Sequence, residues 1–101
     1  MQINRNLGDR RAIAYVLEYF AGLAALTGQS SRAITLAGAA SALRQEIGAP
    51  MSPNELVKLD ELLSPANAQL SEIEQAIAYG QGRGMSMEQA VQYALEAVPQ
   101  T

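Results

Sequence analysis

The chain has 101 residues, of which 49% are apolar and 17% charged, and its formal net charge is -3. This composition fits one small domain rather than several. The sequence contains neither cysteine nor histidine, which excludes disulfides, thiol nucleophiles, Cys/His zinc sites and Ser-His-Asp relays. We therefore expect no enzyme activity, with no catalytic residue, no cofactor and no metal site. The absence of cysteine agrees with a reducing compartment, and we expect a cytoplasmic protein.

Charge is divided unevenly between the two halves of the chain. Residues 1–50 carry five arginines against three acidic residues, whereas residues 51–101 carry seven acidic residues against two basic ones. Nucleic-acid binding requires clustered basic residues, so we expect no direct nucleic-acid partner. The apolar stretch 12–26 contains Glu18 and is shorter than the ~20 residues of a membrane span. We therefore expect no membrane partner and interpret the stretch as a buried helix.

The first half predicts a helical hairpin over residues 10–47. Residues 1–8 show no periodicity and are expected to be a flexible N-terminal segment, with Asp9 capping the first helix. Apolar residues then recur at helical spacing up to Gly28, which is suited to a left-handed turn. Ser30 or Ser31 is expected to cap the second helix, which ends before Pro50.

The second half predicts two to three further helices over residues 52–98, which complete a single domain spanning residues 9–98. Three segments open with the same capping pattern, at Ser52, Ser71 and Ser86. Pro65 predicts a break or kink in the first of them. The second carries the apolar positions Ile73, Ala76 and Ile77 and ends in the glycine-rich run 80–84; the third has apolar positions up to Val98 and stops before Pro99.

The first helix carries a second apolar stripe beside its core face, and a helix that is apolar on most sides must be covered on most sides. We predict that this stripe forms a protein interface made by Tyr15, Glu18, Tyr19, Gly22 and Leu26. The alternative is that the C-terminal helices fold back over it. Tyrosines suit both an interface and a half-wet core edge, so the sequence leaves the two open.

Two features of the second helix concern packing rather than ligands. Gly38 costs about 1 kcal/mol relative to alanine inside a helix, which predicts close contact with another backbone at that point. Arg44 is expected to extend to the surface and pair with Glu46 or Glu18 in an exposed salt bridge. The acidic pairs at 60–61 and 72–74 are interpreted as solvent-facing or helix N-terminal charges.

The hairpin resembles one degenerate tetratricopeptide (TPR) unit. Large and small residues stand where that motif places its packing positions: Leu17, Ala21, Ala24, Ala33, Ala37 and Ala40. The closing proline of the motif would fall at Gln45 but appears only at Pro50, as in a terminal repeat. The resemblance implies an all-α fold of the α-α superhelix type, with a TPR-like hairpin followed by capping helices.

A closer resemblance covers residues 8–96. The segments that carry it are GDRRAIAYVLEYFAGLAALTGQSSRAITLAGAASALRQEIGAPMSP and GRGMSMEQAVQYALE. They are similar to the C-terminal helical-repeat region of large bacterial regulators, namely LuxR-type and related transcription factors and predicted signalling ATPases and cyclases. The resemblance implies a non-catalytic protein-interaction module whose partner is a second copy or a neighbouring helical repeat. The alternative is a purely structural end cap of a repeat array, with no partner of its own.

Overall fold

The computed structural model describes residues 7–96, and every regular element in that range is an α-helix. The helices follow in the order α1 (Leu7–Leu26), α2 (Ser30–Ile47), α3 (Pro53–Gln69), α4 (Glu72–Arg83) and α5 (Met87–Glu96). The described chain measures 38 × 36 × 21 Å. Because a helix with its side chains is about 10 Å wide, the shortest dimension accommodates two layers of helices. The all-α prediction is confirmed.

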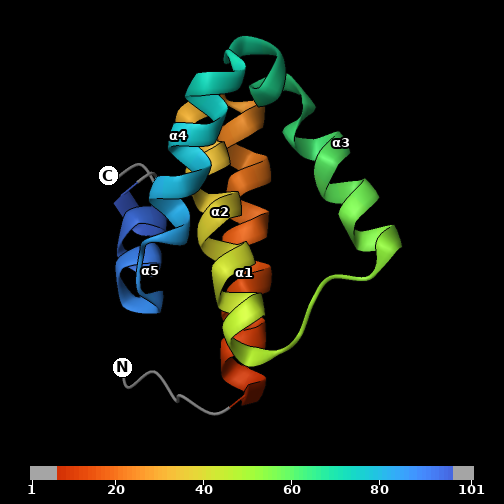
Figure 1. Cartoon of the computed structure of the whole chain (residues 1–101), viewed down its shortest axis with the longest axis vertical. Helices are drawn as coiled ribbons and strands as arrows, with labels where there is room; N and C mark the ends of the chain where they lie inside the picture. The colour runs from red at the N-terminus through yellow and green to blue at the C-terminus, as the bar shows by residue number, and fades with distance from the viewer. Residues whose placement is uncertain (1–6, 97–101) are drawn as a thin grey trace.

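Helices α1 and α2 form the predicted antiparallel hairpin at the centre of the molecule (Figure 1). α1 ends in a Schellman turn, in which the Gln29 amide donates to the Ala24 carbonyl at 2.8 Å and the Gly28 amide donates to the Ala25 carbonyl at 3.4 Å. Gly28 has a φ of 80°, a conformation that strains any residue with a Cβ atom. The role predicted for this glycine is confirmed.

The hairpin packs mainly through small side chains. All six positions that match the TPR pattern are buried: Leu17, Ala21, Ala24, Ala33, Ala37 and Ala40. Alanines at a helix contact shorten the distance between the two axes, because little side-chain volume separates the backbones. One such hairpin is compatible with many helical folds, so the superhelical TPR arrangement stays a prediction.

Two helices begin at positions that differ from the prediction. α1 begins at Leu7, so Asp9 lies in its first turn, where a negative charge favours the helix dipole, and is not its N-cap. The predicted N-terminal segment 1–8 thus overlaps α1 at two residues, and residues 1–6 lie outside the described part of the chain. α2 has Gln29 as its N-cap, without a side-chain cap. Ser30 instead donates a hydrogen bond of 2.9 Å to Gln69 at the end of α3.

The three predicted capping boxes are all present. In each box the serine hydroxyl accepts a hydrogen bond from the backbone amide of the residue three positions later. The side chain of that later residue accepts in turn from the backbone amide of the serine. The pairs are Ser52/Glu55, Ser71/Glu74 and Ser86/Gln89. These boxes satisfy amide groups that the first helical turn leaves unpaired. The predicted helix end at Val98 and Pro99 lies outside the described residues.

Helix α3 continues through Pro65 to Gln69, so the chain does not break at this proline. Proline lacks the amide that would bond to the carbonyl of Glu61, four residues earlier. Both residues are exposed, and water can therefore hydrogen-bond to that carbonyl. Because water satisfies the Glu61 carbonyl, the lost hydrogen bond does not force the helix to end at Pro65.

Helix α4 crosses α2 at very short range, as the glycine at position 38 predicts. A Cβ atom on Gly38 would overlap the backbone of Tyr79, and one on Gly82 would overlap the carbonyl group of Thr35. α4 ends at Arg83 with Gly84 as its C-cap, within the glycine-rich run 80–84 where its end was predicted. The face of α4 that meets α2 consists of Ala78 and Gly82, both buried.

This crossing overturns the apolar face predicted for α4. Ile73, Ala76 and Ile77 are all exposed, because they lie on a different side of the helix from Ala78 and Gly82. The hydrophobic pattern predicted that the face with the isoleucines is buried. The close approach of the α2 and α4 backbones instead buries the face with the smallest side chains.

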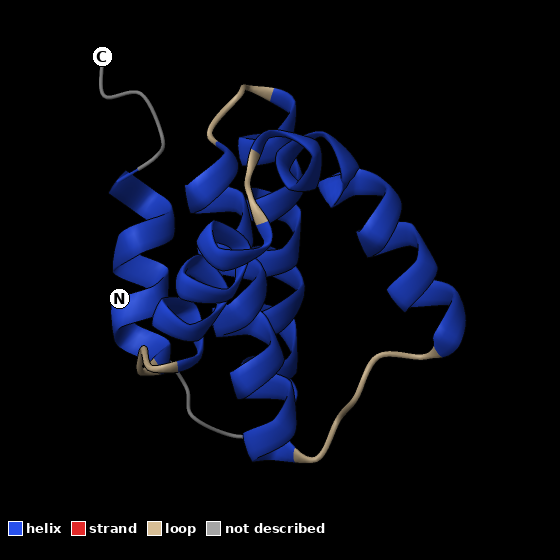
Figure 2. Ribbon diagram, turned by 45° about the horizontal axis from the view of Figure 1, so that its top comes forward, coloured by secondary structure: helices blue, strands red, loops and turns tan. Residues whose placement is uncertain are grey.

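Helix α5 lies on the side of the hairpin opposite α3, as Figures 1 and 2 both show. It buries Ala90 and Ala94 against the hairpin. Arg32 of α2 donates a 2.8 Å hydrogen bond to the Tyr93 carbonyl, and its guanidinium lies 4.3 Å from the centre of the Tyr93 ring. α5 therefore closes one flank of the hairpin, α3 packs on the other, and α4 crosses α2 (Figure 1).

Candidate binding groove

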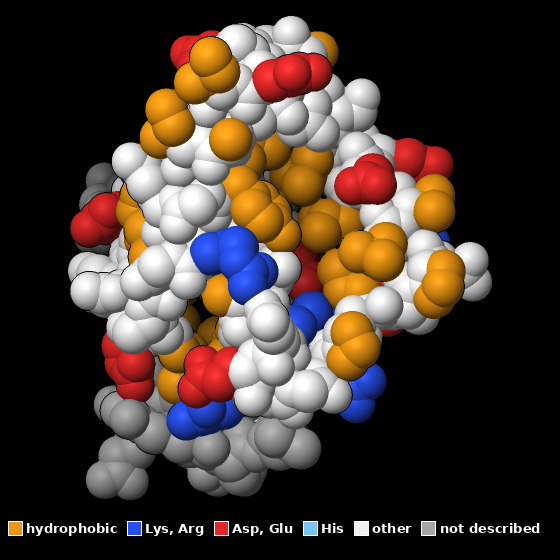
Figure 3. Space-filling view, in the orientation of Figure 1, with side chains coloured by type: hydrophobic (Ala, Val, Ile, Leu, Met, Phe, Trp, Pro, Cys, Tyr) orange, Lys and Arg blue, Asp and Glu red, His pale blue; other side chains and the backbone are white. Residues whose placement is uncertain are grey.

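Helix α3 packs on α1 and α2 but contacts α4 very little, which leaves a groove between α3 and α4. Figure 3 shows apolar side chains gathered around this hollow. Its volume is about 520 Å³, and α2 forms its floor. Its lining includes Ala37, Ser41, Arg44 and Gln45 on α2, Leu56, Leu59, Asp60 and Leu63 on α3, and Tyr79 on α4.

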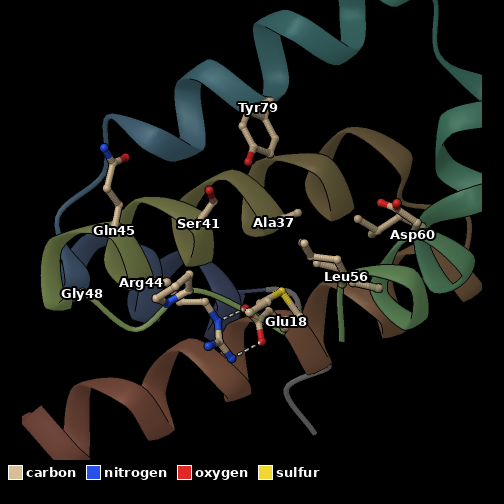
Figure 4. A pocket seen from close by; sticks show the side chains of 13 residues that line it. Glu18, Ala37, Ser41, Arg44, Gln45, Gly48, Leu56, Asp60 and Tyr79 are labelled. Atoms are coloured by element: carbon tan, nitrogen blue, oxygen red, sulfur yellow. Dashed lines mark hydrogen bonds and ion pairs between the residues drawn. The ribbon is translucent and has the colours of Figure 1, made fainter. Parts of the chain in front are cut away.

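A buried ion pair lies at the base of the groove (Figure 4). Arg44 donates two hydrogen bonds to the carboxylate of Glu18, at 2.6 Å from Nε and 3.0 Å from Nη2, and a third of 3.0 Å to the Ala49 carbonyl. Arg44 is 3% exposed and Glu18 7%. Hydrogen bonding to Glu18 raises the pKa of Arg44 further above its usual value. Arg44 and Glu18 thus form a bidentate ion pair beneath α3.

The pair corrects part of the prediction for Arg44. The partner Glu18 was among those predicted, but the expected exposed salt bridge is wrong because α3 covers this part of α1. Glu46, the other predicted partner, instead pairs with Arg10 at 3.0 Å on the surface. A buried pair of this kind is expensive to break, since either partner alone would be an uncompensated charge.

Tyr15 connects the ion pair to the start of α3. Its ring centre lies 4.8 Å from the Arg44 guanidinium, and its hydroxyl donates a 2.9 Å hydrogen bond to Glu55. Glu55 also closes the capping box of α3 by accepting from the Ser52 amide. The Ser52 amide, followed by the Tyr15 hydroxyl, lowers the pKa of Glu55 to about 2. These contacts fix the N-terminal end of α3, and with it one end of the groove.

The structure divides the interface predicted on α1. Glu18 and Gly22 are buried beneath α3, and a Cβ atom on Gly22 would lie 3.4 Å from the Leu62 side chain. Tyr15, Tyr19 and Leu26 remain exposed, at 48%, 64% and 70%. The C-terminal helices thus cover part of the predicted stripe and leave the outer part of α1 accessible.

Sequence reasoning did not identify the groove itself. The leucines of its α3 wall have helical spacing but indicate no groove, and Asp60 was interpreted only as a solvent-facing charge. Apolar residues on a second side of the α3 segment, at Val57 and Leu62, were the available signal that this helix contacts more than one surface. Tyr79 gave no signal, because its place on the groove wall depends on the glycine crossing.

The described residues contain no group of three or more side chains suited to holding a metal ion. Among the same residues, no helix is long and apolar enough to cross a membrane. The groove combines apolar walls with three charged side chains, those of Glu18, Arg44 and Asp60.

Comparisons with protein-family models, with curated proteins and with solved structures find no match to this chain. The function proposed for this chain is therefore based on the geometry of the groove between α3 and α4.

Proposed function

We propose that the chain is a non-catalytic helical protein-interaction module, of the TPR-like type found in bacterial signalling and transcription regulators. The observation that supports this most is the open groove between α3 and α4. Its walls are formed by leucines of α3 and Tyr79 of α4. A contiguous apolar surface of this kind is unfavourable in water and is characteristic of a site that a partner covers.

The ion pair supports the same proposal, because it stabilises the site without depending on a ligand. Arg44 and Glu18 saturate each other's strongest hydrogen bonds, so neither is free to act as an acid, a base or an anion receptor. The hydrogen bond from Tyr15 to Glu55 ties the start of α3 to α1. The groove is therefore preformed, which lowers the entropy cost of binding.

A structural end cap is the second candidate, and the outer face of α1 favours it. Tyr19 and Leu26 are more exposed than any other large apolar side chain of this helix. In a repeat array this face would meet the preceding repeat, which buries its neighbour's hydrophobic surface. The two candidates therefore use different surfaces, the groove in one case and the outer face of α1 in the other.

Site-specific photocrosslinking separates the two candidates. A photoreactive amino acid replaces Leu56 in the groove, Tyr19 on α1, or Glu61, which is on α3 but does not line the groove. The interaction module predicts discrete crosslinked products from Leu56 in cells that produce the protein, and none from Glu61. Products only from Tyr19, formed with a neighbouring repeat, would favour the end cap. Equal products from Leu56 and Glu61 would contradict a specific groove.

A further inference from the structure

We propose that the groove receives an amphipathic α-helix of a partner protein, with a lysine or arginine placed against Asp60. This inference rests on the proposed interaction function and specifies the chemistry of the partner. It is supported by the shape of the groove and by the distribution of charge along it.

The floor of the groove has the length of a short helix. It runs along α2 from Ala37 to Gln45, which corresponds to roughly 12 Å, or just over two helical turns, at 1.5 Å per residue. The floor residues Ala37 and Ser41 are small, so a helix backbone can approach closely. The walls are higher, because Leu56, Leu59 and Leu63 line one side at helical spacing. A groove of this shape suits an α-helix with one apolar face.

Three charged side chains line the groove, and two of them neutralise each other. Glu18 and Arg44 form the buried pair described above, which leaves Asp60 as the uncompensated charge. Asp60 has no hydrogen-bond or ion-pair partner among the described residues. In Figure 4 its carboxylate lies on the groove side of α3. A purely apolar occupant would remove water from this carboxylate without replacing its interactions, which is unfavourable.

A basic residue on the occupant removes this penalty and adds an ion pair in a partly dehydrated setting. The opposite end of the groove has the opposite charge. Gln45 and Asp60 lie at opposite ends of the pocket in Figure 4, and Arg83 donates to Gln45 and to Ser41. A uniformly basic helix would be repelled at the Arg83 end, so we place the basic residue at the Asp60 end only.

Two other occupants fit the groove less well, one because of its charge and one because of its shape. An anionic membrane surface would be repelled by residues 53–83, which carry five acidic residues against two basic ones. A second copy of this chain would have to insert α1, its most apolar exposed helix. The sides of α1 are already covered by α2 and α3, so only its outer face is accessible and it cannot enter between two walls.

The experiment uses two synthetic helical peptides with the same leucine stripe. They carry either lysine or glutamate beside the stripe in one terminal turn. Each is titrated into the ¹⁵N-labelled full chain, and amide shifts are followed by NMR. We expect the lysine peptide to shift the resonances of Ala37, Ser41 and Leu59 and to bind about tenfold more tightly than the glutamate peptide.

Two variants with the same change of charge provide the matched control. Asp60→Lys removes the groove carboxylate, whereas Glu61→Lys changes the next residue, which is exposed and does not line the groove. Asp60→Lys should abolish or reverse the preference for the lysine peptide, and Glu61→Lys should retain most of it. Circular dichroism of both variants checks that the fold is kept.

The remaining outcomes separate this inference from the proposed function. If both peptides bind the groove equally, the basic partner is rejected while the interaction module stands. If neither peptide shifts groove resonances, the helix-binding groove is rejected as well. If the groove resonances move on raising the concentration of the chain alone, a second copy is the occupant, and the proposed partner class is wrong.

Discussion

Gly82 of α4 lies directly against the carbonyl group of Thr35 on α2, at a distance that leaves no room for a Cβ atom. The same crossing brings Gly38 against the backbone of Tyr79. Two glycines, one from each helix, therefore set the separation of α2 and α4. Because Tyr79 forms the α4 wall of the groove, this crossing also determines the width of the candidate binding site.

We predict that Gly82→Ala destabilises the fold by about 2 kcal/mol or more, because the added methyl group must push two backbones apart. Gly80→Ala is the matched control on the same helix. A Cβ atom there meets open space, so the gain in helix propensity should stabilise the protein by up to about 1 kcal/mol. Urea unfolding followed by circular dichroism measures both. Equal stability of the two variants would show that the crossing is not as close as described.

The hairpin and the starts of α3, α4 and α5 were predictable because their signals are local. Gly28 permits the turn, and Ser52 and Ser71 begin helices through contacts within four residues. The six packing positions of the hairpin, one leucine and five alanines, were also predictable, because their helical spacing indicates one buried face on each helix. Each of these features depends on neighbours in sequence and not on the final arrangement of the helices.

The groove and the buried charges were not predictable, because they depend on where α3 and α4 lie. Glu18 was predicted to lie in the apolar stripe of α1, for which cover by the C-terminal helices was the open alternative, and its sequence context does not identify α3 as the helix that covers it. Asp60 and Glu61 are adjacent acids with similar surroundings in the sequence. Only the rotation of α3 about its axis places Asp60 in the groove and leaves Glu61 outside it.

We predict that the Glu18–Arg44 pair is costly to break but not essential to the fold. Glu18→Leu or Arg44→Met alone leaves one buried charge without a partner and should destabilise the protein by about 3–5 kcal/mol. The double variant removes both charges, and its destabilisation should be much smaller than the sum of the two. A double-mutant cycle by urea unfolding measures this. Additive effects would contradict a direct interaction between the two side chains.

We predict that stability falls on acidification, partly through Glu55. Its folded pKa of about 2 lies below the unfolded value of about 4.3. A depressed folded pKa contributes stability that is complete above pH ~4.3 and disappears as the pH falls towards 2. Hydrogen bonding to the Ser71 amide lowers the pKa of Glu74 and acts in the same direction.

Thermal unfolding between pH 7 and pH 2 tests this dependence. The variant Glu55→Gln keeps an acceptor for the Ser52 amide but cannot titrate. Its melting temperature should therefore fall less steeply with pH than that of the unmodified chain, and adding Glu74→Gln should flatten the curve further. The same slope in all three proteins would show that these two carboxylates do not determine acid sensitivity.

We predict that the exposed face of α1 supports weak self-association. Tyr19 and Leu26 are the most exposed large apolar side chains of α1, and pairing two such faces would remove both from water. Light scattering after size exclusion should show a mass rising above 10.8 kDa as concentration increases. The variant Tyr19→Ser with Leu26→Ser should remain monomeric, and its unfolding free energy should change by no more than about 0.5 kcal/mol per site, because both side chains are exposed. A chain that stays monomeric at every concentration would reject self-association and leave this face for a neighbouring repeat.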